Sequence, residues 1–343
     1  MPQQGDIGMK PALWSGQETK QREAGMNLNI FAPGSDALDM TGTDEFRSLL
    51  TSAGELGIAH DPAVPYASRN IVLRQHRFHY LEWGRADAPT VILLHGGHQQ
   101  AHSWDLVSLH LARRFRVLAL DQRGHGDSEW ARDVDYSGRA MAQDAAAFIS
   151  AIGGGKPVVV GHSMGGRNGM LLARDHAGLM RALVAVDIGP EISDAGRQQI
   201  AGFVAANNEF DNLEHFIENV RKYDAYRPRE HIERTVKYNM FERVDGKYIS
   251  KCDATPRRLG LRPGQRPGDN VTLEDCAKFD LPVLVVRGET SNILAPDAAE
   301  RLRDALPLGE LVTVEKAGHG VPSQNTKGFL AALVPFLERV AAR

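Results

Sequence analysis

Cysteine is scarce in this sequence of 343 residues, and so are long apolar runs and any surplus of one charge. The two cysteines, Cys252 and Cys276, form neither a CxxC pair nor a dense disulfide set, which excludes a zinc ribbon and favours a reducing compartment. No apolar run approaches the roughly 18 residues of a membrane span, so no membrane partner is expected. With 40 basic and 43 acidic side chains the net charge is -3, which disfavours nucleic acid as a partner.

A secretory leader is also missing, because the first residues have neither a basic start nor an apolar stretch. We therefore expect a cytoplasmic protein. Apolar residues make up 42% and charged residues 24%, which is the usual globular balance. At about 150 residues per domain, the length fits one large core with an inserted subdomain.

The pattern of apolar runs predicts an α/β fold. Short runs alternate with helical stretches over residues 65–190 and 281–343, and such unbroken runs suit strands that are buried on both faces. This part is predicted to be the core, a mostly parallel central sheet flanked by helices. The predicted strands lie at 71–73, 78–81, 91–94, 117–120, 158–160, 182–186, 283–286 and 311–314.

Two further regions break this alternation. Residues 191–280 read as helices plus an Asp245-Gly246 hairpin signal, which predicts a mainly helical cap subdomain inserted after strand 6. Residues 1–64 are rich in turn formers and polar residues, with one helical candidate at 44–56, and read as an N-terminal extension. The extension leaves a homodimer contact open.

The strongest chemical signal is the G-x-S-x-G segment from Gly161 to Gly165. It follows the apolar run at 158–160 directly and precedes a helical stretch, which is the context of a nucleophile elbow. On such a turn the Ser163 hydroxyl is held clear of the sheet edge. The sequence therefore predicts Ser163 as a nucleophile.

A serine nucleophile needs a histidine base, a carboxylate and donors for the oxyanion. His319 follows the last predicted strand, where a loop at the carboxyl edge of the sheet would bring its ring over Ser163. The expected oxyanion donors are the backbone N–H groups of Met164, after the nucleophile, and Gly97, after an early strand. His98 and Gln99, beside Gly97, are expected to lie next to the substrate.

Together these residues resemble the α/β-hydrolase superfamily, from about residue 70 to the C-terminus. The segment 95–104 (HGGHQQAHSW) looks like the oxyanion segment of a capped, esterase-like branch. The segment 121–128 (DQRGHGDS) is similar to the D-x-R-G-H-G-x-S loop of the family, which implies that Arg123 and Asp127 brace the sheet edge.

The resemblance departs from the usual pattern at the acid. Many members place the acid in a strand-end segment of the form G-x-x-D, but here Ser291 stands at that position. A related branch supplies the acid from the end of the preceding strand, where this chain has Asp187. Asp187 is therefore the predicted acid of the triad, and Glu289 is the second candidate.

These residues therefore predict a cofactor-independent serine hydrolase that cleaves a small or medium carboxylic ester or lactone. The resemblance also allows carbon–carbon bond cleavage of a diketone-like ring-fission product, or a small-molecule receptor on a hydrolase scaffold. It disfavours dehalogenase and epoxide hydrolase chemistry, which need an aspartate in place of Ser163. His98 and His102 lie four residues apart without a third ligand, so no metal site is predicted.

Overall fold

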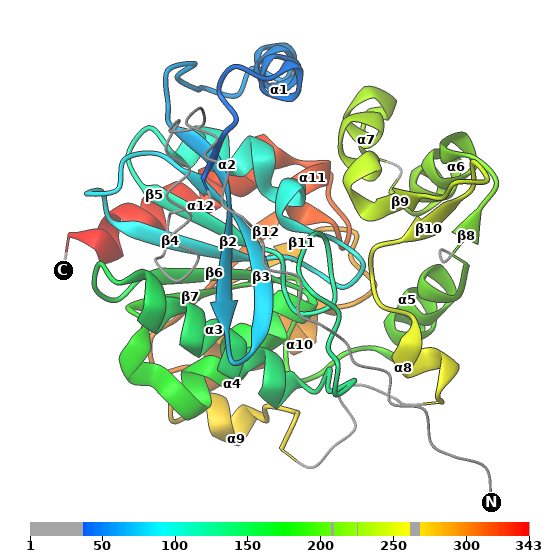
Figure 1. Cartoon of the computed structure of the whole chain (residues 1–343). Helices are drawn as coiled ribbons and strands as arrows, with labels where there is room; N and C mark the ends of the chain where they lie inside the picture. The colour runs from blue at the N-terminus through cyan, green and yellow to red at the C-terminus, as the bar shows by residue number, and fades with distance from the viewer. Residues whose placement is uncertain (1–36, 207–208, 225, 261–267, 343) are drawn as a thin grey trace, which may run out of the picture.

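A nine-stranded sheet forms the centre of the protein (Figure 1). The structure is a computed structural model and describes residues 37–206, 209–224, 226–260 and 268–342. From β5 to β12 neighbouring strands run parallel, whereas β1, β2 and β3 form an antiparallel edge. In spatial order the strands are β1 (Leu38–Asp39), β2 (Tyr66–Leu73), β3 (His76–Trp83), β5 (Arg116–Leu120), β4 (Thr90–Leu94), β6 (Val158–His162), β7 (Ala182–Val186), β11 (Val283–Gly288) and β12 (Gly309–Val314).

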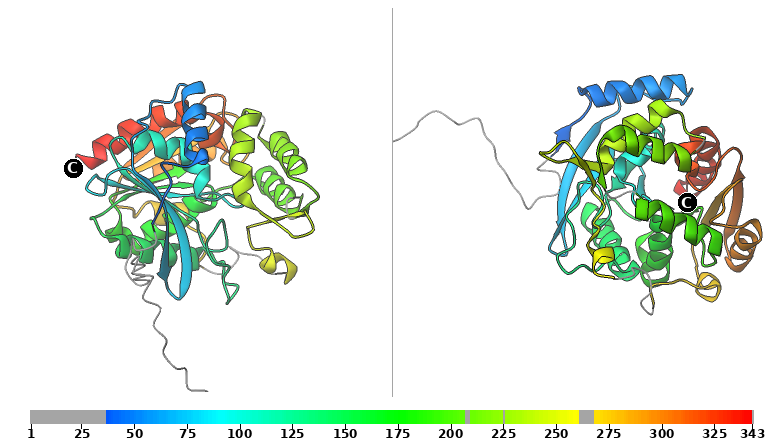
Figure 2. Two further views of the ribbon diagram at one scale, coloured as in Figure 1. Left: turned by 45° about the horizontal axis from the view of Figure 1, so that its top comes forward. Right: turned by 90° about the vertical axis from the view of Figure 1, so that its right-hand side faces the viewer.

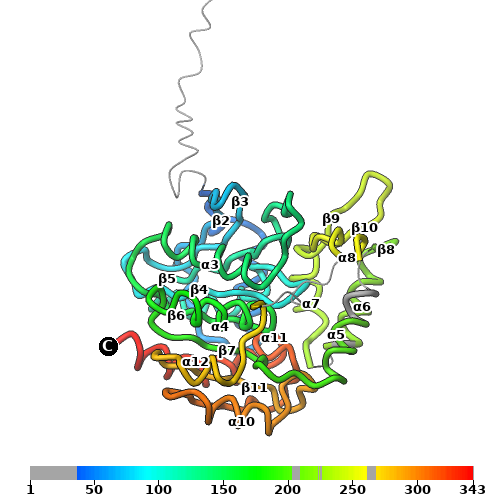
Figure 3. Tube along the Cα trace, turned by 90° about the horizontal axis from the view of Figure 1, so that it is seen from below, coloured from blue at the N-terminus to red at the C-terminus, as the bar shows by residue number. Residues whose placement is uncertain are grey.

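Helices cover both faces of this sheet, which confirms the predicted α/β class (Figure 3). Alternate residues of one strand enter two separate cores: Val91 and Leu93 of β4 pack in one, Ile92 and Leu94 in the other. The first core is closed by α1 (Asp44–Glu55), α2 (Asp105–Leu111), α11 (Val321–Gln324) and α12 (Thr326–Ala341). The second is closed by α3 (Gly138–Ile152), α4 (Met164–His176), α9 (Leu273–Cys276) and α10 (Pro296–Ala305).

The chain joins this core earlier than the predicted boundary at residue 64. β1 pairs with β2, and α1 begins at a Thr43 cap and buries Phe46 and Leu49 in the first core. The Phe46 ring lies 6.3 Å from the ring of Trp83. The apolar residues of this helix lie on the face that packs against the core, so α1 is part of the core and not of an extension. The predicted extension up to residue 36 lies outside the described residues.

Segment 191–280 mostly stands beside the sheet (Figure 2). Besides α9, its elements are α5 (Asp194–Ala206), β8 (Glu209–Phe210), α6 (Leu213–Tyr223), α7 (Arg229–Val236), the 3-10 turn η3 (Lys237–Asn239), β9 (Met240–Glu242), β10 (Tyr248–Ser250) and α8 (Thr255–Arg258). β8, β10 and β9 form a small separate sheet, and Gly246 takes a φ of 80° in the hairpin between β9 and β10. Phe216, Ile232 and Met240 belong to a small core of this segment.

The end of the segment rejoins the main core before residue 281, because Val271 and Cys276 pack in the second core. Across the described parts of the chain, we find no helix with the length and apolar character to cross a lipid bilayer.

Candidate active site

Strand register places the predicted site residues at one edge of the sheet. Leu94 of β4 pairs with Gly161 of β6, and His162 pairs with Val186 of β7. These strands are parallel, so their carboxyl ends lie together. Gly97, Ser163 and Asp187 follow three of these ends, and the loop after β12 adds His319.

Ser163 occupies a sharp turn between β6 and α4. Its backbone has a φ of 50°, in the left-handed region that non-glycine residues rarely adopt. A side chain at Gly161 would place its Cβ 2.4 Å from Gly165 O, and one at Gly165 would place it 2.2 Å from Leu94 O. Both glycines of the G-x-S-x-G segment are therefore required by close backbone approach.

Ser163, His319 and Asp187 form a continuous hydrogen-bonded chain. His319 Nδ1 lies 2.8 Å from Asp187 Oδ2, and His319 Nε2 lies 2.9 Å from Ser163 Oγ. A carboxylate only accepts, so Nδ1 carries the proton and Nε2 accepts from the serine hydroxyl. This tautomer is the one in which the histidine takes up the serine proton.

Asp187 is fully buried and accepts three hydrogen bonds. Gly288 N–H donates to Oδ1 over 3.0 Å, and the Ser291 hydroxyl and His319 donate to Oδ2. Buried carboxylates are costly unless they are paired and hydrogen-bonded, and these donors meet that need. Ser291, at the position where many relatives carry an acid, thus binds the aspartate that comes from β7.

Glu289 lies elsewhere. Its side chain is exposed, and its Oε2 accepts from the backbone N–H of Lys316 over 3.0 Å. No described contact joins it to His319, so the geometry favours Asp187 over this second candidate.

Gly97 and Met164, whose backbone N–H groups are the expected oxyanion donors, lie at the cavity that contains Ser163. Both residues line that cavity, and within the described residues neither N–H has a hydrogen-bond partner. Met164 is the first residue of α4, where N–H groups point out of the helix end. Two N–H groups without partners, in the cavity that contains a serine hydroxyl, could bind an oxyanion.

The cavity has a volume of about 290 Å³. Core and segment 191–280 both line it, and much of the lining is apolar, with Ile188, Ile192, Ile200, Phe216, Val220 and Val236 among its residues. His98 and Gln99 line it too. Gln99 Oε1 accepts from Gly96 N–H over 2.9 Å, whereas His98 Nε2 lies 2.9 Å from Arg257 Nη1. Gln99 therefore positions the loop that carries Gly97.

Two histidines beside the chain are held neutral. Burial lowers the pKa of His95 to about 3, and burial together with the nearby His319 lowers the pKa of His162 to about 3. His95 Nε2 accepts from Gln122 N–H over 2.9 Å, and His162 Nε2 donates to the His319 carbonyl over 2.7 Å. These rings hold the loops around Ser163.

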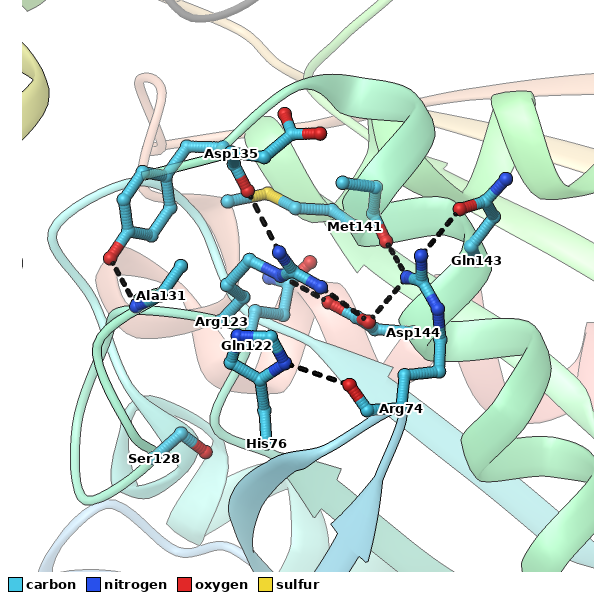
Figure 4. Close-up of polar contacts among 12 residues, drawn as sticks. Arg74, His76, Gln122, Arg123, Ser128, Ala131, Asp135, Met141, Gln143 and Asp144 are labelled. Carbon is cyan, nitrogen blue, oxygen red and sulfur yellow. Dashed lines mark hydrogen bonds and ion pairs between the residues drawn. The ribbon is translucent and has the colours of Figure 1, made fainter. Parts of the chain in front are cut away.

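The segment 121–128 contributes no described residue to the cavity and has a bracing geometry (Figure 4). The buried Arg123 guanidinium contacts both oxygens of Asp144, at 2.7 and 2.9 Å, and Arg74 binds the same carboxylate over 2.7 Å. Asp127 pairs with Lys251 of segment 191–280 over 2.5 Å. Arg123 and Asp127 thus join elements, as the resemblance implies.

Among the described residues, a group formed by His79, Asp121 and Asp127 lies close enough together to hold a metal ion. It belongs to the same bracing loop, and Asp121 already accepts from three donors within the fold. These contacts explain the group without a metal.

Three charged residues of the cavity wall were not singled out from the sequence: Arg167, Asp224 and Arg227. Arg167 stands four residues after Ser163 on α4, which is one helical turn, so its place near the nucleophile was readable. The two others come from segment 191–280, whose packing over the site has no sequence signature.

Comparison with known proteins identifies the class. Residues 89–326 match the family described as alpha/beta hydrolase fold, and the chain belongs to this family. This confirms the resemblance inferred from the motifs.

Two relatives make the comparison more specific. Esterase Rv0045c of Mycobacterium tuberculosis is 29% identical over 300 residues, 85% of this chain and 95% of that protein. One of its crystal structures superposes with a TM-score of 0.71 at 27% identity, covering 87% of this chain and 99% of that one. The 2-(acetamidomethylene)succinate hydrolase of Mesorhizobium japonicum is 28% identical over 267 residues, 74% of this chain and 90% of that protein. The chain is thus a hydrolase.

Proposed function

We propose that the protein is a serine hydrolase that cleaves small or medium carboxylic esters or lactones through an acyl-enzyme, without a cofactor. The observation that carries the proposal is the chain from Ser163 through His319 to the buried Asp187, next to two free N–H groups in one cavity. A relative named as an esterase, similar along most of its length, supports the same reaction.

In the first half-reaction, Ser163 Oγ attacks the acyl carbon while its proton passes to His319 Nε2. Asp187 accepts from His319 Nδ1 and stabilises the imidazolium. Gly97 and Met164 N–H bind the oxyanion, and the tetrahedral intermediate collapses when the leaving alcohol takes the proton from His319. A water deprotonated by His319 then attacks the acyl carbon, and release of the acid restores the serine hydroxyl.

Segment 191–280 acts in this proposal as a cap that sets substrate size. A cavity of about 290 Å³ lies at the small end of the usual range for ligand sites, roughly 300 to 1,000 Å³. Small acyl and alcohol groups are therefore the expected substrates.

The test is labelling of the purified protein with a fluorophosphonate, followed by peptide mapping and an assay with 4-nitrophenyl butyrate. We expect an adduct on Ser163 and ester turnover that is lost in Ser163→Ala. Folded protein that shows neither would overturn the proposal and favour the receptor alternative. Turnover of a diketone-like ring-fission substrate without any ester turnover would favour carbon–carbon bond cleavage.

A further inference from the structure

The charge on the cavity wall is unbalanced. Its described lining contains two arginines, Arg167 and Arg227, and one carboxylate, Asp224. His162, also in the lining, is neutral because burial lowers its pKa to about 3. The wall of a cavity that is otherwise mostly apolar thus has a net positive charge.

Arg227 is already occupied within segment 191–280. Its Nη2 donates to the His231 carbonyl over 2.7 Å and to the Thr235 hydroxyl. Asp224, three residues earlier, is buried and supplies the opposite charge nearby. The charges of Arg227 and Asp224 therefore balance each other, and the charge of Arg167 remains unbalanced in the described lining.

Among the residues that the structure describes, none pairs with the charge of Arg167. Its backbone N–H donates to Ser163 O over 2.9 Å, which fixes it one turn along α4 from the serine. Within the described residues its guanidinium makes no hydrogen bond and no ion pair within 4.0 Å, and its Nε is buried without a partner. The nearest opposing influence is the charge of buried Asp269, whose Oδ1 accepts from Arg139 N–H.

Three other arginines with little exposed side-chain surface have partners. Arg123 binds Asp144 at 2.7 Å, Arg234 binds Asp105 at 2.8 Å, and Arg287 donates to the Leu294 carbonyl over 3.0 Å. Burial of part of a guanidinium without a partner is costly. A cation that lines a cavity and has no partner among the described residues therefore indicates a ligand that completes it.

We propose that Arg167 binds a carboxylate of the substrate, so that the natural ester or lactone carries a carboxylate about one helical turn from the scissile carbonyl. The planar guanidinium fork matches both oxygens of a carboxylate, and the surrounding apolar wall strengthens the pairing. The inference rests on the proposed ester hydrolysis and specifies its substrate class.

Matched ester pairs test this inference on both sides of the scissile bond. On the acyl side, mono-4-nitrophenyl glutarate is compared with its methyl ester. On the alcohol side, 4-acetoxybenzoate is compared with methyl 4-acetoxybenzoate. After subtraction of the uncatalysed rates, we expect kcat/KM for the anionic member of one pair to exceed that of its neutral partner by at least about tenfold, as for a hydrogen bond to a charged group.

Substitutions then locate the effect. Arg167→Gln should bring the anionic-to-neutral ratio close to one, and Arg167→Lys should keep part of it. Arg113→Gln is the matched control, because it removes one exposed positive charge before β5, at the opposite edge of the sheet, and should leave the ratio at its wild-type value. The ratio is measured on one enzyme sample, so a partly unfolded variant does not imitate the result.

The outcomes separate the two proposals. Neutral esters turned over with no anionic preference in either pair would overturn the carboxylate inference and leave ester hydrolysis intact. A ratio unchanged in Arg167→Gln would overturn it too, and a stability loss in that variant repaired by Asp269→Asn would show that Arg167 only balances Asp269. Absence of any turnover and of Ser163 labelling would reject ester hydrolysis itself. If Arg167→Gln does not fold, the wild-type protein is labelled with the fluorophosphonate in the presence of glutarate or glutaramide. Protection of Ser163 by glutarate but not by glutaramide would support the inference. Equal protection by both compounds would overturn it.

Discussion

Two regions of the molecule contain a hydrogen-bonded chain of serine, histidine and aspartate. In the second, the Ser68 hydroxyl lies 2.8 Å from His79 Nε2, and His79 Nδ1 lies 2.7 Å from Asp121 Oδ2. These distances nearly equal the 2.9 and 2.8 Å of the Ser163 chain. The tautomer is the same as well, since the carboxylate accepts from Nδ1–H.

The surroundings of the two chains differ. Ser68 lies within β2, in the register of an ordinary antiparallel pair with Leu81, and is not among the residues that line the Ser163 cavity. Asp121 also accepts from the backbone N–H groups of Ala101 and Asp127, and so ties two loops together. Hydrogen-bond geometry therefore does not distinguish the proposed nucleophile, Ser163, from Ser68. A strained turn, a cavity and free N–H donors do.

Replacement of each serine gives the largest expected contrast. Ser163→Ala should lower kcat by about a millionfold, as loss of the nucleophile does in characterised serine hydrolases. Ser68→Ala removes only a hydroxyl from β2 and should leave kcat within a factor of about three. Turnover of 4-nitrophenyl butyrate measures both, and equal losses in two folded variants would contradict the distinction.

Replacement of each aspartate sharpens the contrast. Asp187→Asn should lower kcat by about ten-thousandfold, because the amide no longer holds His319 in the required tautomer. Asp121→Asn should act mainly on the fold and lower the free energy of unfolding by about 2 kcal/mol, since a charged acceptor is lost. Urea unfolding and ester turnover on both variants measure the two effects. Glu289→Gln, which alters an exposed carboxylate, is the control and should change neither.

Acid tests the neutral histidines around the Ser163 chain. The unfolded imidazole has a pKa of 6.5, whereas burial lowers that of His95 to about 3. Below pH 6.5 the His95 imidazole binds a proton in the unfolded state but not in the folded state. The contribution of neutral His95 to the free energy of unfolding is therefore fully present above pH 6.5 and is lost as the pH falls below it. Between pH 7 and pH 5 this loss amounts to about 2 kcal/mol. Urea unfolding at both values should show a smaller decline in His95→Asn than in the wild type. An equal decline would mean that His95 accepts a proton in the folded state.

The smallest expected effect concerns Ser291. Its hydroxyl donates to Asp187, and Ser291→Ala should lower kcat about tenfold with little change in KM, because the carboxylate loses one donor. Ser291→Thr keeps the hydroxyl and should recover most of the rate. A change in KM alone would place Ser291 in substrate binding instead.

Much of the parallel sheet was predictable because its strands are buried on both faces and read as unbroken apolar runs. Ser163 was predictable because close backbone approach forces glycines at fixed spacing around it. β1 was not, since two exposed residues have no periodicity. α2 was missed for a similar reason, because seven residues hold too few turns for a clear pattern.

Within the site, the sequence ranked Asp187 ahead of Glu289 as the acid but left Glu289 as a second candidate. Asp187 and Glu289 differ in which loop faces His319, and only the folded arrangement decides that. Arg167 shows the same limit, because its lack of a partner is a property of the surrounding residues. The second serine chain joins residues from β2, β3 and the end of β5, and nothing in those local sequences marks their meeting.

The N-terminal helix α1 touches two parts of the molecule that the hydrolase motifs treat as separate. It buries Phe46 against the core, and it contacts α7 of segment 191–280 (Figure 1). The Glu45 carboxylate of α1 lies 3.5 Å from the Lys237 ammonium group in η3, the turn that follows α7. The segments that resemble the α/β-hydrolase motifs begin well after this helix, so a shortened protein designed to start at residue 65 would keep every proposed catalytic group. It would still lose the contacts through which α1 connects segment 191–280 to the core. Such a fragment is a poor choice for substrate screening. Segment 191–280 lines the cavity, and without α1 it would be held less firmly, so the substrate preference of the fragment would differ from that of the whole protein.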